Sequence, residues 1–194
     1  MPSAADADRR YGAVSITLHW LLAGLILAQI AFGVFLADVM PDAATNRAAM
    51  ANLHKSVGLT ILVLSLVRLG VRVTHPAPPL PAHVPGWQRV LARATQVAFY
   101  VLMIGMPLTG WLMTSGGSRP IVFFGLFDVP KIPGVADLPR EVRGSFHEAH
   151  ETLARLTLGL LALHVAGALK HHLLDRDPVL WRMLPIVGRP RARR

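Results

Sequence analysis

Four long apolar stretches constrain this chain more than any other feature of its sequence. They cover residues 16–37, 54–73, 95–113 and 150–171, and each is close to the roughly 20 helical residues that cross a bilayer core. Only 16% of the residues are charged, whereas a soluble domain has about a quarter. The sequence therefore predicts an all-α membrane protein, a four-helix bundle in one domain over residues 1–194.

The first stretch raises the alternative of a cleaved signal peptide, because Arg9 and Arg10 precede it. Its apolar run is longer than the roughly 7–15 residues of a signal-peptide core. It also contains His19 and Gln29, which are unusual in such a core. We therefore expect it to be retained as a membrane span.

The positive charge of the chain predicts its orientation. With both termini on one face, 13 of the 20 Lys and Arg residues but four of the 11 Asp and Glu residues lie there, so that face carries the whole net charge of +9. Cytoplasmic faces are rich in Lys and Arg, so both termini are expected to be cytoplasmic. The basic tail, residues 186–194, then contacts anionic lipid, and no nucleic-acid partner is expected.

Two connections between the apolar stretches are unusual in composition. Residues 75–81 are rich in proline and predict an extended loop. Residues 115–145 are rich in glycine and proline and contain three phenylalanines. We expect this second connection to lie against the membrane surface, and no helix is predicted in it.

The absence of cysteine limits the cofactors that the chain can hold. It excludes iron–sulfur clusters, thiolate zinc sites and the covalent attachment of c-type haem. Any redox cofactor must be held by nitrogen or oxygen ligands, and the nine histidines are the obvious source.

Four of these histidines form two pairs matched in depth. His150 and His164 are fourteen residues apart, which brings them within about 40° of the same helix face and separates them by about 21 Å along the axis. His54 opens the second span at the outer level of His150. His19 lies near the cytoplasmic start of the first span, at the level of His164.

Two facing histidines are the usual axial ligands of a six-coordinate haem iron held between helices. Zinc or copper would need three or four ligands at one point. The pattern therefore predicts two haem b groups in the bundle core, with the pairs His19/His164 and His54/His150 as iron ligands. Plain hydrogen-bonded histidines between helices are the alternative. His147 is an alternative to His150, although it lies about 100° off the His164 face.

Two further residues are candidate cofactor contacts. Arg68 follows His54 by fourteen residues, at the inner level, where its guanidinium suits a haem propionate; a snorkelling arginine is the alternative. His171 follows His164 by seven residues and is a candidate for a quinone carbonyl or a propionate. The alternative for His171 is a basic helix end at lipid headgroups.

Four glycines are candidates for close approach to a porphyrin: Gly33, Gly58, Gly105 and Gly110. Glycines also serve plain helix packing in membranes, so this signal alone does not separate the two roles.

Several motifs resemble the bacterial cytochrome b561 family, which includes cytochrome b subunits of hydrogenases. The resemblance covers residues 10–185, and the motifs are SITLHW at Ser15–Trp20, LHKSVG at Leu53–Gly58, VRL at Val67–Leu69, HETLA at His150–Ala154, LHVAGALKHH at Leu163–His172 and LWRMLP at Leu180–Pro185. The resemblance implies a four-helix di-haem fold in the bacterial inner membrane, with the same two histidine pairs as ligands. It also implies a similarity to short stand-alone members that act as superoxide oxidases and reduce ubiquinone.

We therefore expect a transmembrane electron-transfer protein that links a periplasmic donor, with superoxide as a candidate, to the quinone pool. Such a protein would be a superoxide:quinone oxidoreductase. One alternative is the anchor subunit of a hydrogenase or dehydrogenase, in which a periplasmic partner delivers the electrons. A second is a histidine-using metal or proton transporter without haem, although no internal repeat typical of transporters is found.

Overall fold

The computed structural model describes residues 10–80 and 84–185; the predicted basic tail and Arg9 lie outside the described residues. Four long helices dominate: α2 Ala13–Val34, α3 Arg47–Thr74, α4 Gly86–Ser115 and α5 Arg140–Leu173. A π-helical turn, η1 (Phe35–Val39), continues α2. A short 3₁₀ helix, η2 (Trp181–Met183), follows α5.

Helices α3, α4 and α5 each enclose one of the apolar stretches and extend beyond it, and α2 does so together with η1. Helices α4 and α5 begin directly after Pro85 and Pro139. Proline has a fixed φ and no N–H, so it suits the start of a helix. The polar turns outside the apolar stretches therefore belong to the helices and not to loops.

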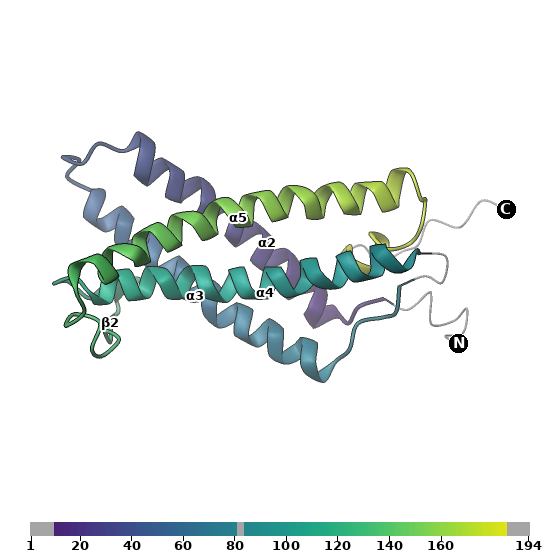
Figure 1. Ribbon diagram of the computed structural model, residues 1–194, viewed down its shortest axis with the longest axis horizontal. Helices are drawn as coiled ribbons and strands as arrows, with labels where there is room; N and C mark the ends of the chain where they lie inside the picture. The colour runs from purple at the N-terminus through teal and green to yellow at the C-terminus, as the bar shows by residue number, and fades with distance from the viewer. Residues whose placement is uncertain (1–9, 81–83, 186–194) are drawn as a thin grey trace.

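The four helices run alternately up and down, and sequence neighbours pack against each other (Figure 1). The start of α2 and the end of α5 lie at one end of the bundle, and the strand β2 lies at the other. All four helices are long and apolar enough to span a membrane. The predicted four-helix membrane bundle is confirmed.

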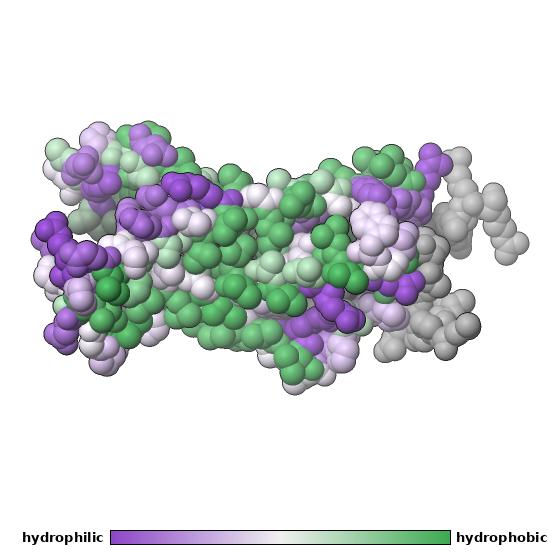
Figure 2. Space-filling model, in the orientation of Figure 1, coloured by the Kyte–Doolittle hydropathy of each residue, from purple (hydrophilic) through white to green (hydrophobic). Residues whose placement is uncertain are grey.

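The surface of the bundle is apolar in its middle. Figure 2 shows an apolar band between two polar ends. Large side chains such as Leu163 and Val63 are exposed, as expected where lipid replaces water as the solvent. The buried core is small and consists of Leu22, Ile26, Ile61 and Met103.

The connection between α4 and α5 is more ordered than the sequence predicts. It contains a two-stranded antiparallel hairpin, β1 (Ile121–Phe123) and β2 (Phe127–Val129), with Phe123 opposite Phe127. Phe124 and Gly125 turn the chain with φ values of 47° and 79°. Three-residue strands give too little alternation to be recognised in a sequence, and a lone hairpin is marginal without other support.

That support comes from α3. The Asn52 amide donates to the Val122 carbonyl at 2.5 Å and accepts the Val122 N–H at 3.0 Å. The fully buried Ser56 accepts the Phe124 N–H at 3.1 Å. These bonds fix the hairpin to the helix that carries His54.

We expect Asn52→Ala to loosen this hairpin without unfolding the bundle. The change removes the side-chain partner of the Val122 N–H and the shortest bond to its carbonyl, which keeps longer bonds from Ser56 Oγ at 3.3 Å and the Gly125 N–H at 3.5 Å. Loss of the N–H partner costs about 1–3 kcal/mol. Hydrogen exchange over residues 121–129 should become at least several times faster. Asn46→Ala is the matched control, because Asn46 precedes the same helix and makes no side-chain capping bond. Equal exchange rates in the two variants would contradict the anchoring role.

Candidate functional site

The inner histidine pair joins the first and last long helices. His19 on α2 and His164 on α5 face each other with ring centroids 6.2 Å apart and planes at 67°. The ring of Phe99, on α4, lies edge-on to His164 at 5.3 Å. Residues that are 145 positions apart in the chain are thus brought together between two membrane-spanning helices.

The outer pair joins α3 to the first half of α5. His54 and His150 face each other with ring centroids 6.3 Å apart and planes at 74°. The two pairs therefore have nearly the same separation, although they involve different partner helices. Helix α5 contributes one histidine to each.

The separation of the rings fits an iron atom between them. Metal–imidazole bonds of about 2 Å on each side, together with the distance of about 1 Å from ring nitrogen to ring centre, place two axial imidazole centroids about 6 Å apart. Both pairs meet this requirement. No third metal-ligating side chain joins either pair among the described residues, since the one cluster of three such groups there lies elsewhere.

The backbone of α5 stands apart from the two helices that carry its partner histidines. Helix α5 packs along α4, but it makes at most marginal backbone contact with α2 and α3, which carry the partner histidines. Thr157 is the only buried residue among those described for α5. It lies seven residues from both His150 and His164, on the same helix face. The residues present therefore fit two haem groups, one beside each histidine pair.

Two of the four candidate glycines lie directly against the outer histidines. A Cβ on Gly33 would lie 3.2 Å from His54 Cε1, and a Cβ on Gly110 would lie 3.2 Å from His150 Cε1. At Gly58 and Gly105 a Cβ would make ordinary contacts, with Gln29 and Leu153. The structure thus separates glycines that make room for an imidazole from glycines that only allow helix packing.

The outer histidines differ in their hydrogen bonds. His150 Nδ1 lies 3.0 Å from the Met106 carbonyl oxygen and 3.1 Å from Thr109 Oγ1. Because a carbonyl only accepts, Nδ1 carries the proton, and Nε2 is available for a metal. His54 Nδ1 is buried and has no partner among the described residues. The buried Gln29 donates to the His54 carbonyl oxygen at 2.5 Å.

Arg68 lies at the inner pair, as the spacing suggests. Its guanidinium donates to the Ser15 carbonyl oxygen at 3.0 Å and lies 3.3 Å from His19 Nδ1. A guanidinium only donates, so His19 Nδ1 accepts in this arrangement. The cation is held between α3 and α2, directly against one candidate ligand.

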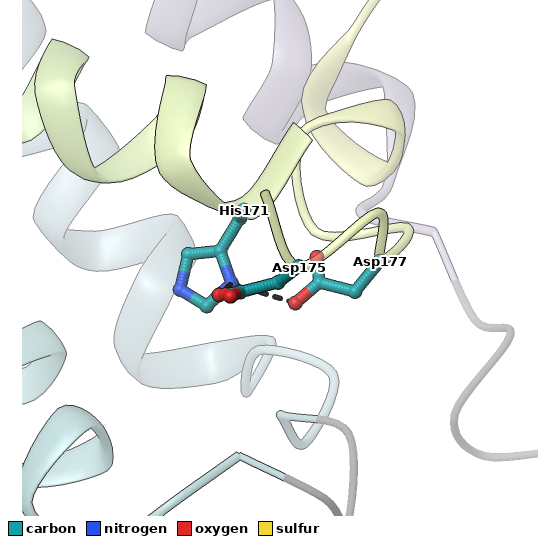
Figure 3. A group of neighbouring side chains, drawn as sticks. All are labelled: His171, Asp175 and Asp177. Atoms are coloured by element: carbon teal, nitrogen blue, oxygen red, sulfur yellow. Dashed lines mark hydrogen bonds and ion pairs between the residues drawn. The ribbon is translucent and has the colours of Figure 1, made fainter. Parts of the chain in front are cut away.

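His171 lies beyond the inner pair, where α5 ends (Figure 3). Its Nδ1 bonds to Asp177 Oδ2 at 2.6 Å and lies 3.3 Å from Asp175 Oδ2. Lys170 binds the same Asp175 oxygen at 2.5 Å. The two carboxylates thus orient the ring, and its Nε2 makes no hydrogen bond within the described part of the chain.

His147 is placed apart from both pairs. Its side chain is 62% exposed, with Nε2 3.2 Å from Glu151 and Nδ1 3.3 Å from the Met113 sulfur.

Two outer-face cations are engaged by the loop after α4. Lys131 donates to the Gly117 and Ser118 carbonyls, and Arg143 donates to that of Gly116.

Sequence reasoning missed several residues at these sites. Gln29 carried a signal, since a polar side chain within a span is expensive and suggests a function. Asn52, Ser56, Thr109 and the Met106 carbonyl carried none, because their partners lie between 41 and 70 positions away in the chain.

Comparisons with known proteins identify the family of the chain. The model of the family described as prokaryotic cytochrome b561 matches residues 10–185. The chain is similar to cytochrome b561 homolog 2 of Escherichia coli strain K12, with 34% identity over 94% of this chain and 95% of that protein. It is also similar to the probable superoxide oxidase CybB of Yersinia pestis, with 27% identity over 91% of this chain and 97% of that protein.

A third relative is cytochrome b562 of Cereibacter sphaeroides, with 30% identity over 90% of this chain and 94% of that protein. The match to the family model covers nearly all of the described helices and all four paired histidines. The chain therefore belongs to the prokaryotic cytochrome b561 family of haem-binding membrane electron-transfer proteins.

Proposed function

We propose that this protein holds two haem b groups and carries electrons across the bacterial inner membrane, from a periplasmic donor to quinone. The observation that carries the proposal is the double histidine pairing along α5, with ring separations of 6.2 and 6.3 Å. His19 and His164 would hold the inner haem, and His54 and His150 the outer haem. Each bound haem supplies a one-electron ferric–ferrous couple.

The electrons would enter at the outer pair. Each histidine pair would supply both protein ligands of an iron, so a donor would transfer its electron without binding the metal. Superoxide is our candidate donor, because the Yersinia pestis relative is named a probable superoxide oxidase. Two superoxide anions would give two electrons and leave two molecules of dioxygen.

Quinone, with ubiquinone as the candidate, would take up these electrons at the inner end. Reduction to quinol needs two electrons and two protons. His171 is placed to bind a quinone carbonyl through Nε2, since Asp177 and Asp175 fix its other nitrogen. Arg68 is the proposed propionate partner of the inner haem, because its guanidinium is held at that level by Ser15.

The orientation follows from charge. The face that receives both termini carries an excess of Lys and Arg, so we place both termini in the cytoplasm. His19 and His171 are then at the cytoplasmic level and the β1–β2 hairpin is at the periplasmic level.

The proposal is tested with purified protein in lipid vesicles. A pyridine haemochrome assay should give two haem b groups for each chain. Superoxide should reduce the haems and, with ubiquinone present, should drive quinol formation that depends on both. A protein with two haems that neither accepts electrons from superoxide nor reduces quinone would refute the donor and the acceptor. An electron supply that depends on a co-purified periplasmic protein would identify an anchor subunit instead.

A further inference from the structure

We infer that Arg68 and the Met106 carbonyl give the two haems different reduction potentials, with the inner haem the higher, so that electrons run inward downhill. The inference rests on the proposed di-haem function and adds a direction to it. It is carried by the different groups that face Nδ1 of one ligand in each pair.

At the outer pair an acceptor faces the ring. His150 Nδ1–H donates to the Met106 carbonyl at 3.0 Å, and Thr109 Oγ1 lies 3.1 Å away. Such a bond raises the basicity of the ligand nitrogen that binds the metal. A more basic ligand stabilises ferric iron relative to ferrous iron, and the reduction potential falls.

At the inner pair a cation faces the ring. In this structure the Arg68 guanidinium lies 3.3 Å from His19 Nδ1 and donates to it. With iron at Nε2 the ring proton would lie on Nδ1 and this bond would be lost, but the cation would stay close and no acceptor of the described residues faces Nδ1. The Ser15 carbonyl keeps the cation in place. A nearby positive charge disfavours the ferric state, which carries one more positive charge than the ferrous state, and the reduction potential rises.

The other charges do not reverse this contrast. The outer ligands also have a cation near them, Lys55, and an anion, Glu151. Among the described residues Lys55 makes no hydrogen bond to an imidazole, whereas Arg68 lies 3.3 Å from His19 Nδ1. Glu151 also binds Arg155 at 3.0 Å, on side chains that are 47% and 76% exposed, where solvent and salt screen the charges. At the inner end no carboxylate of the described residues binds Arg68 or Arg72. The haem propionate proposed as the partner of Arg68 would offset part of its charge and leave the cation at the His19 ring.

The consequence is a directed path. An electron that leaves ferrous outer iron oxidises it to ferric iron and reduces ferric inner iron to the ferrous state. The electron moves from the weaker to the stronger acceptor without a proton or a further reactant. Onward transfer from the outer to the inner haem is thereby favoured, and return of the electron to the donor is suppressed.

The experiment is a spectroelectrochemical titration of the purified holoprotein, and it should show two one-electron waves. In His150→Ala, which lacks the outer haem, the surviving wave should be the higher of the two. Arg68→Gln should lower this wave by about 59 mV, which is a tenfold change for a one-electron couple. Arg68→Lys keeps the positive charge, so the potential of this wave should stay close to its value with Arg68.

Two further variants complete the test. Arg72→Gln, one turn away and bonded to Gln96 at 3.2 Å, should leave both waves unchanged. Thr109→Val removes only the hydroxyl and should raise the lower wave by less than Arg68→Gln moves the higher one. The inference would be overturned if the wave that remains in His150→Ala were the lower of the two. It would also be overturned if Arg68→Gln raised the reduction potential of the inner haem. Two haems with the expected order but no quinone reduction would refute only the proposed function.

Discussion

Replacing His150 with alanine is expected to remove one of two haems and to leave the other in place. His150 and His54 face each other across 6.3 Å at the outer level, whereas His164 of the inner pair lies about two turns beyond Thr157 on the same helix. An iron with one remaining histidine loses half of its protein ligation. The haem content should fall from two to one for each chain, and haem reduction by an outer donor should fall at least about tenfold, equivalent to roughly 1.4 kcal/mol.

His147→Ala is the matched control for this change. His147 is on the same helix, three residues away, but it is exposed and bonded to Glu151. This variant should keep both haems and the low-spin spectrum of six-coordinate iron. If His147→Ala lost a haem and His150→Ala did not, the outer ligand would be assigned to the wrong histidine.

A larger side chain at Gly110 is expected to displace the outer haem although no ligand residue is substituted. A Cβ at this position would lie 3.2 Å from His150 Cε1 and 3.4 Å from Nδ1, closer than most real contacts. The γ-methyls of Gly110→Val would push the ring away from its bond with the Met106 carbonyl. Overpacking of this kind costs about 1–3 kcal/mol, so retention of the outer haem should weaken about tenfold to a hundredfold.

Gly105→Ala provides the comparison on the same helix. A Cβ there would meet Leu153 Cδ1 at 3.8 Å, which is an ordinary contact. Haem content after washing with detergent should match the unsubstituted protein in Gly105→Ala and fall in Gly110→Val, with the loss confined to the outer haem. Loss of both haems would indicate general unfolding, and no loss would show that the imidazole has room to move.

Gln29 is a residue whose importance the sequence indicates but whose partner it does not identify. Its polarity within an apolar span is plain from the sequence. Its partner, the His54 carbonyl, becomes evident only when α2 and α3 are packed together. Gln29 and Gly33 lie one turn apart on α2, and both contact His54, one at its backbone and the other at its ring.

The hairpin β1–β2 is the opposite case, because no pattern in the sequence indicates it. Three-residue strands do not establish a periodic pattern. Their order depends on Asn52 and Ser56, which lie between 66 and 70 positions away. The expectation of an irregular connection over residues 115–145 was therefore wrong for the segment that contacts the outer ligand helix.

The sequence by itself determined the four-helix membrane bundle and predicted the depth of each paired histidine. Both follow from local rules, since bilayer thickness fixes span length and the helical rise fixes depth. Tertiary structure alone decided what surrounds each imidazole. Gly33 lies against His54, Gly110 and the Met106 carbonyl lie against His150, and the Arg68 guanidinium lies against His19. Those contacts join different helices, and their positions depend on how the helices pack, which no periodicity within a single helix specifies.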